Sequence, residues 1–147
     1  GDLNANQLKV RIREAFADGE DHAPIRLSLV TFGFKNGLPL DADLVFDLRF
    51  LPNPYWEEEL RPLSGLDEPI STYVLSQDGA EDFVTAASQM VRQLLPGYVR
   101  EGKTYLTVAL GCTGGRHRSV AVAESLATHL AAEGAPNTVF HRDIDRP

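Results

Sequence analysis

The chain has 147 residues, the size of one ordinary domain, and its 43% hydrophobic and 24% charged residues are typical of a globular protein. A net charge of −7 and a pI near 5.0 give no support to nucleic-acid binding through overall positive charge. One cysteine excludes an internal disulfide framework and a multi-cysteine zinc site, and it fits a reducing, cytoplasmic compartment. The apolar stretches are too short and too often interrupted to predict a membrane span.

The leading residues, 3–17, predict an amphipathic helix, because apolar side chains from Leu8 to Phe16 recur every four residues. A polar stretch follows this helix. We therefore divide the chain into an N-terminal helix and linker, 1–24, and an α/β domain, 25–147.

The second part of the chain alternates strand patterns with helix patterns. In chain order, we predict a strand over 25–32, a strand over 44–50, a proline-rich loop over 51–65, helices over 67–75 and 79–95, a strand over 104–110, a helix over 118–133 and a strand over 138–142. This alternation predicts an α/β fold, with a mainly parallel sheet of about four strands and helices on both faces. Tyr55 and Trp56 are expected to pack the proline-rich loop rather than to form a binding platform.

A glycine-rich loop, residues 111–119, lies between the third strand and the helix that follows it. Ligands of open α/β sheets bind beyond the carboxyl ends of strands, and a helix start offers unpaired N–H groups and the positive end of a dipole. Glycines let the backbone approach a ligand, and basic and hydroxyl side chains add donors. This glycine loop therefore predicts a site for a phosphate or a similar anion. Its candidate ligand-binding residues are Cys112, Thr113, Gly114, Gly115, Arg116, His117, Arg118 and Ser119.

A second candidate group follows the first strand. In a parallel sheet it lies at the same edge as the glycine loop, so Lys35 and Asn36 are predicted to reach the phosphate or an attached sugar. Asp47 and Arg49 share one face of the second strand, and we expect them to pair with each other. Nearby loop carboxylates are more often solvated than metal-bound, and no Walker A pattern is found, so neither a metal nor a cofactor is predicted.

Cys112, Arg118 and Ser119 also resemble the Cys-x5-Arg-Ser/Thr loop of cysteine-dependent phosphatases, in which a thiolate attacks a bound phosphate. Those enzymes usually have histidine where this chain has Gly111, and no loop supplies an assignable aspartic general acid. Cys112 is equally consistent with a small buried residue at a strand end. The first hypothesis is therefore a phosphate-binding regulatory domain that is not an enzyme, and a cysteine phosphatase is the alternative.

Several longer sequence words occur in order along the chain. They are 32–35 (FGFK), 37–54, 60–69, 111–115 (GCTGG), 117–119 (HRS) and 141–143 (HRD). Together they resemble the C-terminal domain of the RapZ family, RNase adapter proteins often named nucleotide-binding proteins. The resemblance covers nearly all of residues 25–144.

The resemblance implies an α/β domain similar to a subdomain of phosphofructokinase. In enteric members this domain senses glucosamine-6-phosphate, forms oligomers, binds small RNAs and presents them to an endoribonuclease, so the resemblance implies these partners and a homo-oligomer here. By position, the phosphosugar contacts fall on Thr113, Gly114 and Arg118. Asn36 stands where the enteric sensors have a ligand-binding histidine. Full-length members also carry an N-terminal domain with Walker boxes, which these residues do not contain.

Overall fold

Four parallel strands, in the order β2-β3-β1-β4, form the sheet in the computed structural model, which describes residues 25–146. The predicted α/β class and parallel sheet are confirmed. The predicted helix over 3–17 and the boundary at 24 lie outside the described residues. The elements are β1 (Arg26–Gly33), η1 (Phe34–Asn36), β2 (Leu44–Asp47), η2 (Pro54–Trp56), α2 (Glu68–Leu75), α3 (Ala80–Arg100), β3 (Tyr105–Cys112), α4 (Arg118–Ala132) and β4 (Asn137–His141).

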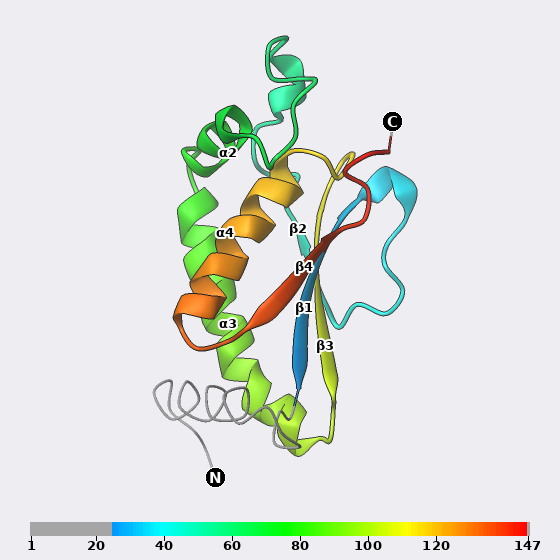
Figure 1. Ribbon diagram of the computed structural model, residues 1–147, viewed down its shortest axis with the longest axis vertical. Coiled ribbons are helices and arrows are strands. Elements are labelled where there is room, and N and C mark those ends of the chain that lie inside the picture. The colour runs from blue at the N-terminus through cyan, green and yellow to red at the C-terminus, as the bar shows by residue number, and fades with distance from the viewer. Residues whose placement is uncertain (1–24, 147) are drawn as a thin grey trace.

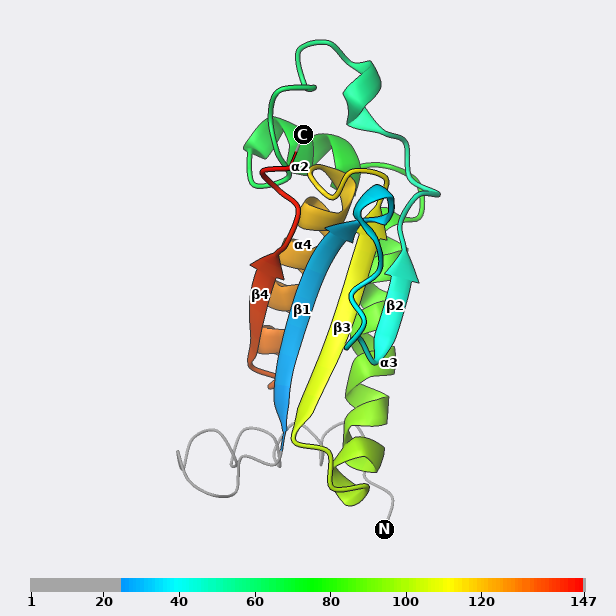
Figure 2. The same ribbon diagram turned by 90° about the vertical axis from the view of Figure 1, so that its right-hand side faces the viewer.

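α3 and α4 cover the same face of the sheet, and α2 lies on that side beyond the carboxyl ends of the strands, packed against α4 (Figure 1 and Figure 2). We predicted helices on both faces. In β1, Leu27 and Leu29 point into the helix-covered core, whereas Ser28 and Val30 lie on the opposite face and stay partly exposed. Among the described residues, the connection over 34–43 is the segment that crosses that second face in Figure 2. The polar–apolar alternation of the strands is the physical reason, because only one of their faces is apolar enough to need a full cover.

Two elements, β2 and α3, end three or more residues from the predicted position. β2 stops at Asp47, because the Asp47 carboxylate accepts a hydrogen bond from the Arg49 backbone N–H at 2.9 Å and turns the chain. The Arg49 guanidinium also pairs with this carboxylate at 2.7 Å, which confirms the predicted pair. α3 continues through Pro96 to Arg100, because apolar residues on both sides of the proline pack in the core and outweigh its missing N–H.

The strand order brings the ends of β1 and β3 together at the centre of the sheet, where Gly33 is in register with Cys112. The β1 connection runs over the open face to β2, and the β3 connection runs through α4 on the other face to β4 (Figure 2). Open α/β sheets bind ligands at the point where the connections of two neighbouring strands leave over opposite faces. Gly111 is required there by packing, because a Cβ on it would lie 2.4 Å from the Phe32 ring. A histidine before the cysteine, as in the phosphatases, would therefore not fit.

Candidate functional site

A cavity of about 640 Å³ lies at this edge of the sheet, a volume within the range of small-molecule sites. The loops after β1, β3 and β4 contribute to its lining, together with the segment around η2. It is basic although the protein is acidic, because its lining contains several cations and one carboxylate, that of Asp145. Such a concave basic surface concentrates anions. The cations are Lys35, Arg61, Arg116, Arg118 and Arg146.

Most of the predicted ligand-binding residues line this cavity. The register of β1 and β3 explains why Lys35 does so, and the Lys35 backbone N–H donates to the Thr113 carbonyl at 3.2 Å. Gly115, Ser119 and Asn36 do not line it. The predicted residues in the lining are Lys35, Cys112, Thr113, Gly114, Arg116, His117 and Arg118.

Arg118 is a buried cation of the cavity, with 4% of its surface exposed. Its Nη1 donates to the carbonyl oxygens of Leu51 at 2.9 Å and Arg49 at 3.3 Å, and its Nη2 donates to the Thr113 hydroxyl at 3.2 Å. Its Nε is buried and has no hydrogen-bond partner. An unbonded buried N–H is costly, and the Nε and Nη2 edge of a guanidinium matches two oxygens of a phosphate. Arg118 is thus fixed in place and still lacks an acceptor.

Arg116 also reaches the cavity, but each nitrogen of its guanidinium already donates to a carbonyl. Nε donates to Leu63 at 3.1 Å, Nη1 to Ile144 at 2.7 Å and Nη2 to Pro62 at 2.6 Å. We predicted a ligand contact for this side chain. In the structure it holds the segment after η2 and the C-terminal segment against the glycine loop.

His117 has a similar structural attachment. Its Nε2 lies 2.6 Å from the Leu63 carbonyl oxygen and 3.2 Å from that of Arg61, so Nε2 carries the ring proton, because a carbonyl oxygen only accepts. Burial lowers the pKa of His117. The bonds to the two carbonyls raise the pKa and the nearby guanidinium charges lower it, and the net direction is downward from 6.5. The ring is therefore neutral at pH 7.

Two residues of the glycine loop serve packing. Gly115 has φ +81°, and a Cβ on it would lie 2.6 Å from the backbone nitrogen of Gly33, so only glycine lets the loop fold onto the end of β1. Ser119 is fully buried. Its hydroxyl accepts from the Cys112 thiol at 3.2 Å, and its amide donates to the Cys112 sulfur at 3.5 Å. Ser119 therefore fixes the position of the Cys112 side chain.

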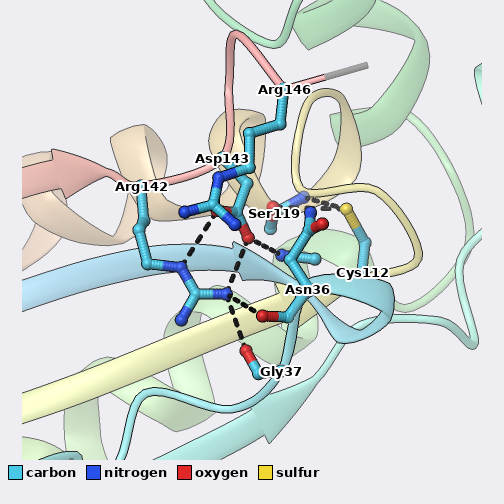
Figure 3. Close-up of polar contacts among 8 residues, drawn as sticks. Asn36, Gly37, Cys112, Ser119, Arg142, Asp143 and Arg146 are labelled. Carbon is cyan, nitrogen blue, oxygen red and sulfur yellow. Dashed lines mark hydrogen bonds and ion pairs between the residues drawn. The ribbon is translucent and has the colours of Figure 1, made fainter.

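Asn36 belongs to a neighbouring cluster, in which Arg142 links the β1 loop to the C-terminal segment (Figure 3). The Arg142 Nη2 donates to the carbonyls of Gly37 at 2.6 Å and Asn36 at 3.3 Å, and to the Asp143 carboxylate at 2.8 Å. Asp143 is fully buried and also accepts from the Gly33 N–H at 2.7 Å. Burial raises the pKa of Asp143, but these hydrogen bonds and the adjacent arginines outweigh burial, so the net pKa is low. Arg142 and Asp143 of the HRD sequence thus hold the C-terminal end of the described residues beside the cavity.

The sequence did not assign the other side of the cavity, which Asn53, Tyr55, Trp56, Arg61 and Pro62 form. We call these residues the aromatic wall. The Arg61 guanidinium lies 4.7 Å from the centre of the Tyr55 ring, and its Nε donates to the Tyr55 carbonyl at 2.9 Å. The Tyr55 and Trp56 rings meet edge to face with centres 5.4 Å apart. Their signal in the sequence is an aromatic pair between prolines, but nothing in the spacing connects that loop to β3.

Within residues 25–146, no cluster of three or more histidine, cysteine or acidic residues is arranged to hold a metal ion. In the same part of the chain, no helix has both the length and the apolar character needed to cross a membrane.

Comparison with known proteins identifies the family. A family model described as the RapZ C-terminal domain matches residues 25–145. A nucleotide-binding protein of Streptomyces coelicolor is 52% identical over 144 residues, which are 98% of this chain and 48% of that relative. A nucleotide-binding protein of Frankia casuarinae is 53% identical over 146 residues, 99% of this chain and 50% of the relative. The chain spans about half the length of the curated relatives it matches, and over residues 25–145 it belongs to the RapZ C-terminal domain family.

Proposed function

We propose that this domain is a regulatory module that binds a phosphorylated small molecule in the cavity beside the glycine loop. The observation that carries the proposal is the side chain of Arg118, a buried cation that lines the cavity and whose Nε has no acceptor in the protein. A phosphate oxygen would satisfy it, and a second oxygen would bond Nη2.

The surroundings of Arg118 support the same ligand class. The Thr113 hydroxyl and the backbone of Gly114 line the cavity next to it, and a Cβ on Gly114 would meet only the Lys35 side chain, at 3.9 Å. α4 begins at Arg118, so the positive end of its dipole adds to the field there. Lys35, Thr113, Gly114 and Arg118 form what we call the phosphate cradle.

Calorimetry on the 147-residue protein tests the proposal with inorganic phosphate and glucosamine-6-phosphate. The resemblance makes the second compound the first metabolite to try. We expect saturable binding that weakens roughly tenfold to a hundredfold in Arg118→Lys, because lysine keeps the charge but loses the paired donors, and such a contact is worth about 1.5–3 kcal/mol. Absence of binding for both compounds, or unchanged affinity in Arg118→Lys, would contradict the proposal.

Two matched variants keep this test specific. Arg100→Ala removes an exposed arginine at the end of α3 and should leave the affinity unchanged. Gly114→Ala places a methyl group in the cradle without a backbone clash, so we expect a folded protein with weaker phosphate binding. Circular dichroism checks the fold of each variant.

The proposed ligand class is consistent with the relatives, whose name, nucleotide-binding protein, refers to one kind of phosphorylated small molecule. The RNA, endoribonuclease and homo-oligomer partners implied by the resemblance stay predictions. Gel shifts across a salt series would test RNA binding, since true phosphate contacts weaken steeply as salt rises.

A cysteine phosphatase is the second candidate function, and the sulfur geometry favours it. Cys112 and Arg118 line one cavity, and the hydroxyl and amide of Ser119 both contact the Cys112 sulfur. Asp145 also lines the cavity and would supply the general acid that the sequence did not assign. The thiolate would attack phosphorus, the alcohol would leave with the Asp145 proton, and water would then release phosphate from the cysteine.

Hydrolysis of a generic aryl phosphate measures this second candidate. If turnover disappears in Cys112→Ser and falls in Asp145→Asn, the phosphatase function is favoured over the binding module. Phosphate binding without turnover in the unmodified protein would reject it.

A further inference from the structure

We infer that the aromatic wall is a second subsite of the same cavity and stacks on a planar base, so that the ligand class is a nucleoside phosphate with its phosphate in the cradle. This inference rests on the proposed function, because it names what the phosphate carries. It concerns the part of the cavity that no phosphate fills: about 640 Å³ is far more space than an oxyanion occupies.

Exposure points to the wall as a contact surface. Trp56 exposes 76% of its surface and Tyr55 exposes 46%, although both line the cavity and touch each other. Large aromatic side chains gain most of their free energy when they are covered, so two adjacent exposed rings at a concave site indicate a partner for their faces. Every nucleobase offers a flat π surface of this kind.

The chemistry of the wall favours a base over a sugar. Apart from Asn53, its side chains are aromatic, guanidinium or proline, and Asp145 is the carboxylate in the lining. The hydroxyls of a sugar ring donate as well as accept, and among the wall side chains only the Asn53 amide and the Tyr55 hydroxyl can accept. A base needs ring faces and a few edge contacts, and a guanidinium plane such as that of Arg61 stacks on it as well.

The wall is hydrogen-bonded to the glycine loop that carries the cradle, which a shared ligand requires. The Arg61 carbonyl accepts from His117, and the Pro62 carbonyl accepts from Arg116. The Gly65 backbone N–H donates to the Arg116 carbonyl at 2.9 Å. On the ring side, Arg61 is bonded to the Tyr55 carbonyl. These bonds fix the backbone that carries the rings before any ligand arrives, so less ordering free energy is lost on binding.

Trp56 is the one tryptophan of the sequence, so its fluorescence reports on the wall alone. The experiment titrates the protein with inorganic phosphate, glucosamine-6-phosphate, and the 5′-monophosphates of adenosine and uridine, following emission and calorimetry together. We expect the nucleotides to bind at least about tenfold tighter than inorganic phosphate, which is the gain expected of a stacked base. We also expect the nucleotides to quench Trp56, whereas inorganic phosphate leaves its emission unchanged.

The variants separate the two subsites. Trp56→Ala should lower nucleotide affinity to that of inorganic phosphate and leave phosphate binding intact, while Trp56→Phe keeps most of the gain. Phe140→Ala is the matched control, because Phe140 exposes 62% of its surface on β4 and does not line this cavity. Nucleotides that bind no tighter than inorganic phosphate, or glucosamine-6-phosphate that equals them in affinity and quenching, would overturn the base subsite and leave the proposed function standing. Failure of every phosphate compound to bind would overturn both.

Discussion

The glycine loop contains two stretches with opposite tasks. Thr113 and Gly114 face the cavity, whereas Gly115 packs on β1 and the side chains of Arg116 and His117 bond to backbone carbonyls. Arg118 then returns to the cavity with an unbonded Nε. Two arginines two positions apart therefore differ: every guanidinium nitrogen of Arg116 has an acceptor in the protein, whereas the Nε of Arg118 has none. The difference lies in whether the protein already supplies the acceptor.

The largest expected effect comes from the two adjacent glycines. Gly115→Ala should lower the free energy of unfolding by roughly 2–5 kcal/mol, because φ +81° is strained for alanine and the new Cβ would lie 2.6 Å from the backbone nitrogen of Gly33. Gly114→Ala should keep or slightly raise it, because its φ is not positive and its Cβ has room. Urea denaturation measures both values. Equal stability of the two variants would remove the distinction between the stretches.

The two arginines should separate in the same way, with a smaller effect. Arg116→Ala should cost about 2 kcal/mol of stability, because three carbonyls lose a charged donor. It should also loosen the aromatic wall, which would show as a lower fluorescence anisotropy of Trp56. Arg118→Lys should affect phosphate affinity more than stability. If Arg116→Ala retains full stability and instead loses phosphate binding, the tasks of the two arginines are exchanged.

The smallest effect is a pH dependence from His117. Because the folded-state pKa lies below 6.5, the unfolded chain takes up the proton first as the pH falls. The stability contribution is therefore fully present above about pH 6.5 and decreases as the pH falls from there towards the folded-state pKa. Urea midpoints across this window should fall more steeply for the unmodified protein than for His117→Gln, which keeps an N–H donor. His129→Gln is the control, and identical slopes for all three proteins would contradict the assignment.

The β3, glycine loop and α4 unit could be predicted because its signals are local: an apolar run, a cluster of glycines and a helical repeat in one stretch of chain. The aromatic wall could not, because the bonds that bring it to the loop join residues far apart, such as Arg116 and Leu63, which are 53 positions apart. The different roles of Arg116 and Arg118 could not be predicted from the sequence for the same reason, because their acceptors include backbone carbonyls of a distant segment. The alternation of polar and apolar residues along β1 indicated that one face of the sheet lacks a helical cover.

The cavity is lined by several loops that are far apart in sequence, and this has a practical consequence. A compound that spans them binds only the folded chain, so mass action transfers its binding energy to the stability of the whole domain. At a concentration of 100 times its Kd, such a compound adds about 2.7 kcal/mol, which raises the Tm by several degrees. A melting screen of unlabelled protein against a collection of metabolites would therefore find the natural ligand before its identity is guessed.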